Sequence, residues 1–560
     1  AVLEDISPRI PTEVSLSGGV SRAIAVKSSL RDPVRFIFGS GPGNFVYSFS
    51  SERPAEFNQN ALWQVRFNRA GNFFYEALAT LGWLGLVSFL VFFGFFVYNI
   101  IVILRQKGGA SVPFLALISV FGALLCGMWF AVPSLPAAML LWLVGALVSG
   151  IAINAAPREF SYISFSLKKS VTSALSLSFG FVFVLVLLLF FGVYMTRTYL
   201  GEYAYYKALT LLVVPPDFPP EDAKKRLDLV RVNLANAITI NNRPEYYLSL
   251  AQVSLTQAQV EAQAAQAPLD TETRGRVQGL LSDAVNYSKI ALDAKPYSVA
   301  MWENRAMIFE SVSSFADQAR DFAIQSLEEA VKLEPTNAAL WYRLGENQRL
   351  QWIEKKASDE PKKKTAQSDE ERVSITLSLL EETQTHLRKA IELKPDYYAP
   401  RLSLSRIAED NDDFDTAINI MQEGLQYSAN QTNAAVYYEI ARLMYNQLLK
   451  DRDSDNKEKL TEIVRVLDQS ISISPNYSNA LYTRALALRQ LGQYERAEKD
   501  MELVVQLNPG NKDVQAQMDA LNNRLSQPVE LPPSPLTLPE GESKEESGVN
   551  TNAEQGENLQ

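Results

Sequence analysis

The chain has 560 residues and combines a hydrophobic content of 47% with a formal net charge of −10. This combination is unusual for a single soluble core, but it is expected when apolar membrane spans are joined to an acidic soluble region. The acidic balance argues against nucleic-acid binding, and the single cysteine, Cys126, excludes a disulfide framework within the chain.

The first 80 residues contain the groups best suited to chemistry. Arg22 is followed by Asp32-Pro33, by the run Gly39-Ser40-Gly41-Pro42-Gly43-Asn44-Phe45, by Asn72, and by Gly82 and Gly85 at the start of an apolar stretch. Over about residues 15 to 150, this order resembles the outer loop of the bacterial O-antigen ligase and polymerase family. The chain starts at Ala1 without an initiator Met or a signal peptide, so we interpret it as the carboxyl-terminal part of a longer protein.

The resemblance implies a multi-spanning membrane glycosyltransferase. Members move a glycan from an undecaprenyl diphosphate carrier to an acceptor at the outer face of the membrane. A leaving diphosphate needs cationic donors, and the acceptor hydroxyl needs a base, whereas no cofactor and no metal is required. Arg22 matches the family's loop arginine and is the first candidate for the diphosphate. Arg66 and Arg69 are weaker candidates, because arginines also anchor helices at a membrane interface.

The glycine run has two interpretations. Gly41 and Gly43 are candidate substrate-binding residues, because backbone amides in such a run can cradle a phosphate. The run lacks the Lys and Ser/Thr of a nucleotide-binding P-loop, however, which favours a tight turn that packs the loop against the membrane face.

One residue departs from the family. Gly71 stands immediately before Asn72, where the family typically has His, and Asn72 remains a candidate substrate-binding residue. Glu76 falls on the same helical face as Asn72 and is the best local substitute base. Three explanations stay open: the activity is lost, another group such as Glu76 or an upstream residue supplies the base, or arginine contacts suffice. Whether the chain is an enzyme is therefore left open.

Four apolar stretches predict membrane helices within residues 81–196. The first, from Leu81 to Leu104, has 24 residues without an Asp, Glu, Lys or Arg, more than the roughly 20 that a spanning helix needs. The others cover about residues 111–132, 135–156 and 173–195. Basic residues follow the first and third stretches, namely Arg105, Lys107, Arg158, Lys168 and Lys169. The positive-inside rule then places the outer loop, residues 1–80, and everything after the fourth span on the periplasmic or extracellular side.

Residues 203–525 predict an α-solenoid of about six tetratricopeptide repeats (TPRs). Pro475 and Pro509 are 34 residues apart, which is the TPR period, and Trp341, Leu344 and Gly345 match the start of another repeat. Such solenoids bind protein partners. His386, the only histidine, is expected to be a surface or packing residue rather than a metal ligand.

The predicted fold is therefore all-α: four membrane spans, a TPR solenoid, and a disordered, acidic, proline-rich tail at residues 527–560. We predict a glycosyltransferase of the cell membrane that resembles O-antigen ligases, with membrane lipids, an undecaprenyl-diphosphate-linked glycan and a protein bound to the repeats as its partners. The alternative is an inactive, membrane-anchored TPR scaffold for the assembly of surface polysaccharide.

Overall fold

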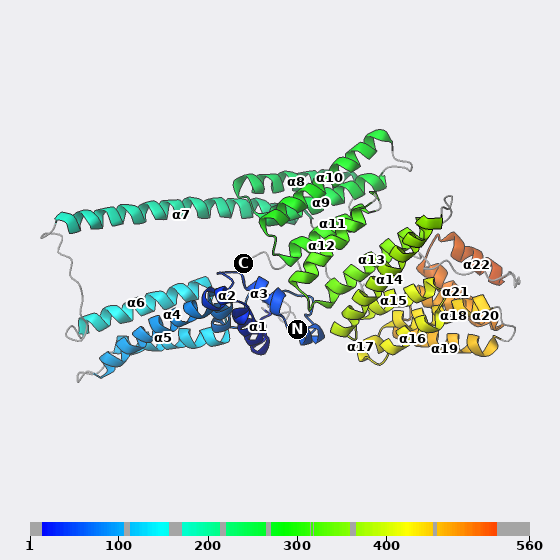
Figure 1. Cartoon of the computed structure of the whole chain (residues 1–560), viewed down its shortest axis with the longest axis horizontal. Coiled ribbons are helices and arrows are strands. Elements are labelled where there is room, and N and C mark those ends of the chain that lie inside the picture. Colours follow the sequence, from blue (N-terminus) through cyan, green and yellow to red (C-terminus); the bar gives the residue numbers. More distant parts are fainter. Residues whose placement is uncertain are drawn as a thin grey trace, which may run out of the picture. The chain divides into compact units, whose positions relative to one another are not determined.

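The computed structural model describes residues 14–105, 112–155, 171–212, 220–264, 270–313, 315–316, 318–358, 366–451 and 456–522. Within these ranges the regular structure is entirely helical (Figure 1), which confirms the predicted all-α class. The predicted tail at residues 527–560 and the predicted loop residues Lys107, Arg158, Lys168 and Lys169 lie outside the described residues.

Short helices form the outer loop before the first long apolar helix. They are α1 (Gly18–Leu30), α2 (Pro33–Phe38), α3 (Phe45–Glu52) and the 3-10 helix η1 (Ala55–Gln59). Asp32 begins α2, because its carboxylate accepts a hydrogen bond of 2.8 Å from the Arg35 amide, and Pro33 suits the first helical position. The loop also buries apolar side chains, among them Ile24, Ala25, Phe45 and Phe49.

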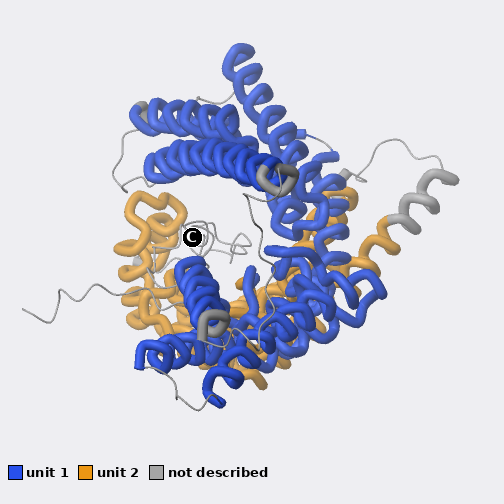
Figure 2. Tube along the Cα trace, turned by 90° about the vertical axis from the view of Figure 1, so that its left-hand side faces the viewer, with its two compact units in different colours: residues 1–57, 66–336 blue, residues 58–65, 337–560 orange. Residues whose placement is uncertain are grey.

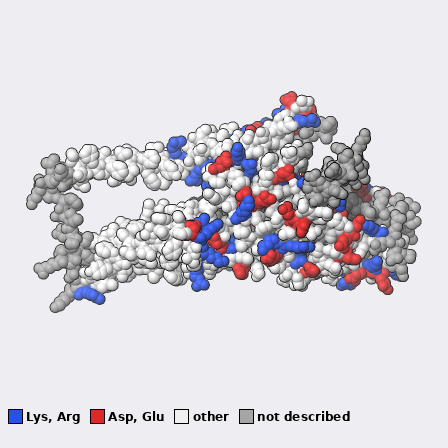
Figure 3. Space-filling view, in the orientation of Figure 1, with Lys and Arg blue, Asp and Glu red and all other residues white. Residues whose placement is uncertain are grey.

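Three helices are long and apolar enough to cross a membrane. They are α4 (Phe73–Leu104), α5 (Val112–Phe130) and, from Leu175 onward, α7 (Val171–Leu212). A shorter apolar stretch, Leu135–Ile151, lies in α6 (Leu135–Ala155). Figure 3 shows that these helices carry almost no charged side chains on the face in view, as a lipid environment requires.

Helix α4 bends sharply at Gly82, where the backbone has a φ of 67° and a ψ of −168°. The ring of Phe73 lies 4.6 Å from that of Phe89, although a straight helix would separate the two residues by about 24 Å along its axis. The segment before Gly82 therefore folds back over the segment that follows it. The straight part of α4 begins next to the predicted start of the first span at Leu81.

Aromatic side chains fill the core between α4, α5 and α6. Phe93 and Phe96 of α4 pack with Phe121 of α5 and with Leu141 and Val144 of α6, and all five side chains are buried. These contacts join the three helices into one bundle, since close packing rather than water exclusion holds helices together in lipid.

The solenoid begins in the second half of α7 and continues to α22. Its helices are α8 (Pro220–Ile240), α9 (Pro244–Ala264), α10 (Thr271–Ala294), α11 (Val299–Val312), α12 (Ala319–Leu333), α13 (Ala338–Ser358), α14 (Ala366–Leu393), α15 (Tyr398–Asp410), α16 (Phe414–Gly424), α17 (Ser428–Gln431), α18 (Ala434–Asp451), α19 (Lys457–Ile473), α20 (Ser478–Gln490), α21 (Tyr494–Leu507) and α22 (Lys512–Asn522). Helix α7 is continuous from its apolar part into the solenoid, where Tyr205 and Ala208 pack on Val230 and Leu234 of α8.

Small residues allow the two helices of a repeat to approach closely. A Cβ atom on Gly345 of α13 would lie 2.8 Å from the side chain of Leu387 in α14, and Ala485 and Ala497 of the α20–α21 pair are fully buried. Gly345 was predicted from the repeat pattern, and the packing at all three positions explains why the pattern demands small side chains there.

The chain divides into two compact units (Figure 2). The first contains residues 1–57 and 66–336, and therefore most of the outer loop, the apolar helices and α8 to α12. The second contains residues 58–65 and the solenoid from residue 337 onward.

Candidate functional site in the outer loop

The glycine run is hydrogen-bonded to the backbone of α4 at its bend and packs closely against it. The amides of Ser40 and Gly41 donate hydrogen bonds of 2.9 Å and 2.8 Å to the carbonyl oxygens of Ala79 and Thr80. A Cβ atom on Gly39 would lie 2.6 Å from the Gly82 nitrogen. Positive φ values at Gly41 and Gly43 turn the chain through the rest of the run. Two amides of the run are therefore bonded to α4, and the run acts as the tight turn that was one of its two predicted interpretations.

Asn72 and Glu76 organise the start of α4. The Asn72 side chain accepts a hydrogen bond of 3.0 Å from the Tyr75 amide, which makes it the N-cap. One carboxylate oxygen of Glu76 accepts a 2.6 Å hydrogen bond from the Ala70 amide. Both residues that were predicted to serve the site thus have a structural role, because they satisfy amides at and before the helix terminus.

Three predicted site residues gather around this corner of the loop. The Gly71 amide donates a 2.9 Å hydrogen bond to the hydroxyl of Ser21, which brings α1 to the start of α4. Arg22 follows Ser21 and is exposed, with no hydrogen bond or ion pair in the part of the chain that the structure describes. Arg69 is also exposed and lies close enough to Glu76 for their charges to interact. Arg69 and the half-buried Glu76 therefore interact at the start of α4, and Arg22 lies one residue from the α1 residue that contacts Gly71.

Gly71 occupies a position that has no space for a side chain. A Cβ atom there would lie 2.1 Å from the carbonyl oxygen of Leu16 and 3.2 Å from the Ser21 hydroxyl. The packing of α1 against the loop therefore requires glycine at position 71, where the family typically has histidine.

We expect Gly71→His to destabilise the protein rather than to restore a base. Overpacking of this kind costs about 1–3 kcal/mol, because Leu16 and α1 must move away. The thermal unfolding midpoint of the purified protein measures the loss. Asn68→His is the matched control, since Asn68 is exposed and its replacement should change stability by no more than about 0.5 kcal/mol. Equal midpoints for the two variants would contradict the predicted crowding at Gly71.

Arg66 lies in a buried network of ion pairs with the solenoid helices of its unit. Its guanidinium donates hydrogen bonds of 2.6 Å to Glu334, directly after α12, and of 2.6 Å to Glu303 of α11. Arg53 donates a 2.9 Å hydrogen bond to the other carboxylate oxygen of Glu334, and the side chains of this pair are fully buried. The hydroxyl of Thr336 adds a 3.0 Å hydrogen bond to the carbonyl oxygen of Arg53.

Burial and the neighbouring carboxylates shift the pKa values of the two arginines in opposite directions. Burial lowers the pKa of Arg53, and the single carboxylate of Glu334 only partly opposes it. At Arg66 burial acts in the same direction, but the carboxylates of Glu303 and Glu334 together raise the pKa above its ordinary value. The predicted diphosphate ligand Arg66 is therefore engaged by two carboxylates.

Sequence reasoning did not identify Arg53 or Glu334. They are 281 residues apart, and neither belongs to a local motif that would link them. The only signal is the occurrence of two arginines in the outer loop that flank the aromatic residues Phe57 and Trp63.

In the second unit, the outer-loop segment 58–65 packs on the junction between α14 and α15. The Lys394 ammonium donates a 2.9 Å hydrogen bond to the carbonyl oxygen of Asn58, whose side chain in turn donates to the carbonyl oxygen of Leu393 at 3.2 Å. The ring of Trp63 lies 5.2 Å from that of Tyr397, and the Lys394 ammonium lies 5.0 Å from the Trp63 ring centre. The outer loop is thus anchored to solenoid residues in both units.

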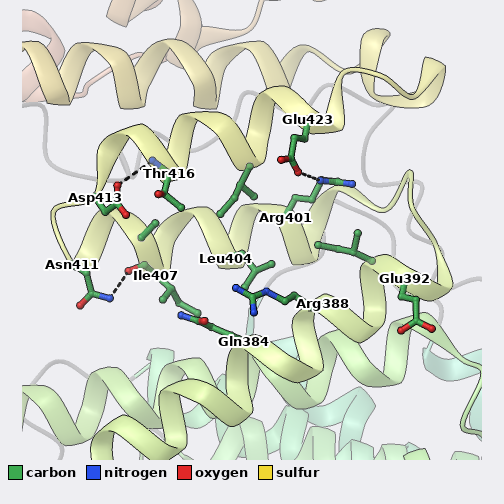
Figure 4. Close-up of a pocket in the computed structure, with 13 residues that line it drawn as sticks. Gln384, Arg388, Glu392, Arg401, Leu404, Ile407, Asn411, Asp413, Thr416 and Glu423 are labelled. Carbon is green, nitrogen blue, oxygen red and sulfur yellow. Dashed lines mark hydrogen bonds and ion pairs between the residues drawn. The ribbon is translucent and has the colours of Figure 1, made fainter.

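A pocket of about 620 Å³ lies between α14, α15 and α16 (Figure 4). Its apolar lining comes from Ile391, Leu404, Ile407, Ala408 and Ile420. Figure 4 shows Arg388 of α14 reaching toward Leu404 and Gln384 of α14 lying beside Ile407, whereas Arg401 is directed to Glu423, 3.6 Å away. Asp413 caps α16 through the Thr416 amide. Of the two arginines that line the pocket, Arg388 is the exposed one.

His386 packs beside the ring of Trp341, with the ring centres 5.3 Å apart, and its Nδ1 atom lies 2.7 Å from the side-chain oxygen of Gln348. Among the described residues, no group of three or more His, Cys, Asp or Glu side chains is placed to hold a metal ion.

We expect His386 to titrate below its ordinary pKa of about 6.5, because burial disfavours the imidazolium. The unfolded chain then binds a proton more readily than the folded chain. The stabilisation is present above about pH 6.5 and is lost as the pH falls through the folded pKa. Since His386 is the only histidine, one imidazole resonance in an NMR titration of histidine-labelled protein measures the value. A pKa at or above 6.5 would contradict the buried placement.

Comparisons with known proteins concern the repeats. Residues 478–511 match the model of the tetratricopeptide repeat family. A tetratricopeptide repeat protein from Parabacteroides merdae is similar over 58% of this chain and 99% of its own, with 13% identity and a TM-score of 0.34. YrrB, described as a TPR protein with an unusual peptide-binding site, is 12% identical over 41% of this chain and 97% of its own, with a TM-score of 0.26.

The Pseudomonas aeruginosa protein pilF is 14% identical over 48% of this chain and 97% of its own, with a TM-score of 0.30. No curated protein matches the sequence. The chain therefore contains tetratricopeptide repeats, as predicted, whereas the resemblance of the outer loop to O-antigen ligases stays a prediction.

Proposed function

We propose that the chain is a membrane-anchored scaffold whose TPR solenoid binds a protein partner close to the membrane surface. The observation that carries this proposal is the network in which Glu334 and Glu303 of the solenoid hold Arg53 and Arg66 of the outer loop. Because of these ion pairs, the repeats would be held next to the loop that precedes the first span. A partner bound to the solenoid would therefore stay close to the membrane.

The same network supports a count of four membrane crossings. The outer loop and the α11–α12 pair must lie on one side of the membrane for Arg66 to reach Glu303. An even number of spans must therefore separate residue 72 from the solenoid. Among the described residues, helices α4, α5 and α7 are long and apolar enough to span, and the shorter apolar stretch in α6 is our candidate for the fourth crossing. Arg105, at the end of α4, favours the cytoplasmic side for that end and the periplasmic or extracellular side for the loop and repeats.

A cysteine-labelling experiment tests this arrangement. With Cys126→Ser as background, we expect Asn68→Cys in the outer loop and Glu498→Cys in α21 to react with a membrane-impermeant maleimide in intact cells. Both residues are exposed. Labelling of one position without the other would refute the shared side.

Partner binding is tested by photo-crosslinking in the living cell. A photoreactive residue in place of Arg388, at the pocket between α14 and α16, should yield a discrete protein adduct. The same residue in place of the exposed Glu498 is the matched control. Equal adduct patterns at the two positions, or none at position 388, would argue against the pocket as the contact site.

A second function, glycan transfer from an undecaprenyl diphosphate carrier, is favoured by the corner that contains Arg22, Arg69 and Glu76. The two exposed arginines offer cations for a diphosphate, and the carboxylate beside Arg69 offers a base. Replacing Arg22 by Ala in the full-length protein should then reduce surface glycan, while Lys27→Ala on the same helix should not. An unchanged glycan profile in the Arg22 variant would remove this function.

A further inference from the structure

Helix α2 presents an apolar surface that none of the described residues of its unit covers. None of its six residues is buried, and Val34 and Phe38 keep 66% and 60% of their surface exposed. Leu30, at the end of α1, is 65% exposed. Large apolar side chains on consecutive turns of adjacent helices mark a binding surface rather than isolated exposed residues.

The position of α2 identifies what this surface meets. The hydrogen bonds of Ser40 and Gly41 to the backbone of α4 fasten the end of α2 beside Gly82, where the straight span begins. The ring of Phe36 lies 6.0 Å from the ring of Trp83, the first residue after the bend. Trp83, Leu84 and Val87 are exposed on α4 and face lipid in a membrane. The apolar surface of α2 continues the lipid-facing surface of α4.

The charges around this surface complement a membrane rather than a protein of the same acidity as this chain. Between residues 22 and 38 the basic residues are Arg22, Lys27, Arg31 and Arg35, and the only acid is Asp32, whose carboxylate caps α2. Val26 and Leu30 follow Arg22 by one and two helical turns and are exposed on the same face of α1. Basic side chains next to exposed apolar ones are typical of helices that lie in the headgroup region.

We propose that α2 and the last turn of α1 insert into the leaflet in which α4 begins, with Leu30, Val34, Ile37 and Phe38 at the boundary between headgroups and acyl chains. Arg22 and Lys27 then contact lipid phosphates, while Arg31 is paired with Glu52 of α3. The outer loop is held by lipid on this side and by Glu303 and Glu334 on the other. The insertion depends on the apolar side chains of α2, which neither partner binding nor glycan transfer uses, and it shares only Arg22 with glycan transfer.

Spin labels in the full chain test the insertion. Cys126 is the only cysteine, so Cys126→Ser provides a background in which Leu30→Cys, Val34→Cys and Phe38→Cys are labelled singly. These side chains are more than half exposed, so the substitutions leave the fold intact. The protein is placed in nanodiscs of phosphatidylcholine and phosphatidylglycerol, and collisions with oxygen are compared with collisions with a water-soluble nickel complex.

We expect oxygen to dominate at the labels on Val34 and Phe38, as it does at Leu90, an exposed residue farther along α4. Asn68, exposed in the outer loop, is the aqueous control, where the nickel complex should dominate. Labels on α2 that behave like the label at Asn68 would overturn the proposal. Labels protected from both reagents would also overturn it, because protein rather than lipid would then cover α2.

Discussion

Glu334→Ala is expected to release the outer loop from the α11–α12 pair, with a cost of about 3–5 kcal/mol, the range found when one partner of a buried ion pair is removed. Both carboxylate oxygens of Glu334 are in use, one by Arg53 and one by Arg66, and its side chain is fully buried. The substitution leaves the equally buried guanidinium of Arg53 without its ion-pair partner Glu334. Arg66 retains Glu303, which limits but does not remove the loss.

Hydrogen exchange measures this release where it occurs. Amides of residues 45–70 and 299–336 should exchange roughly 100-fold to 1000-fold faster in the variant, because local opening replaces the closed network. Glu52→Ala, which breaks the exposed ion pair with Arg31, is the control and should cost no more than about 1 kcal/mol. Exchange that stays at the level of this control would mean that the network does not hold the loop.

The helices and the repeats could be predicted from local sequence patterns, whereas the contacts between the outer loop and the solenoid could not. Apolar runs and the TPR period depend on neighbours within one or two helices, so the positions of Gly345, Ala485 and Ala497 were open to prediction. The contact of Arg66 with Glu334 spans 268 residues and depends on tertiary packing alone. A single sequence carries no signal for such a pair, since either residue also fits an ordinary exposed position.

Whether these residues form a functional site stays a prediction. The motif order singled out the glycine run and Asn72, and the structure brings both to the start of α4, because glycines with positive φ and an N-cap residue are recognisable in the sequence. The bend of α4 was not predicted. A charge-free run of 24 residues predicts a straight span, and nothing local indicates that the chain before Gly82 folds back.

Gly82→Ala should therefore be among the most disruptive single substitutions in the outer loop. A Cβ atom at this position would lie 2.5 Å from the Ile37 carbonyl oxygen and 2.6 Å from the Gly39 nitrogen, and both are backbone atoms that no rotamer change can move. The backbone angles, with φ at 67° and ψ at −168°, belong to a region that is essentially restricted to glycine and costs other residues about 1–3 kcal/mol. The steric clash adds a loss of stability of similar size, because the hydrogen bonds from Ser40 and Gly41 to α4 must break to make room for the side chain.

Two further glycines separate these contributions. Gly43 has a φ of 74° and no atom within 4 Å of the position that a Cβ atom would take, so Gly43→Ala should show the conformational cost alone. Gly94 has open space around it within the helical part of α4, so Gly94→Ala should be neutral or slightly stabilising. The combined Gly39→Ala/Gly82→Ala variant should cost less than the sum of its parts, because both side chains break the same contact. Thermal unfolding midpoints measure these four variants and Gly39→Ala alone, and a midpoint for Gly82→Ala no lower than that for Gly43→Ala would show that α4 tolerates a side chain at its bend.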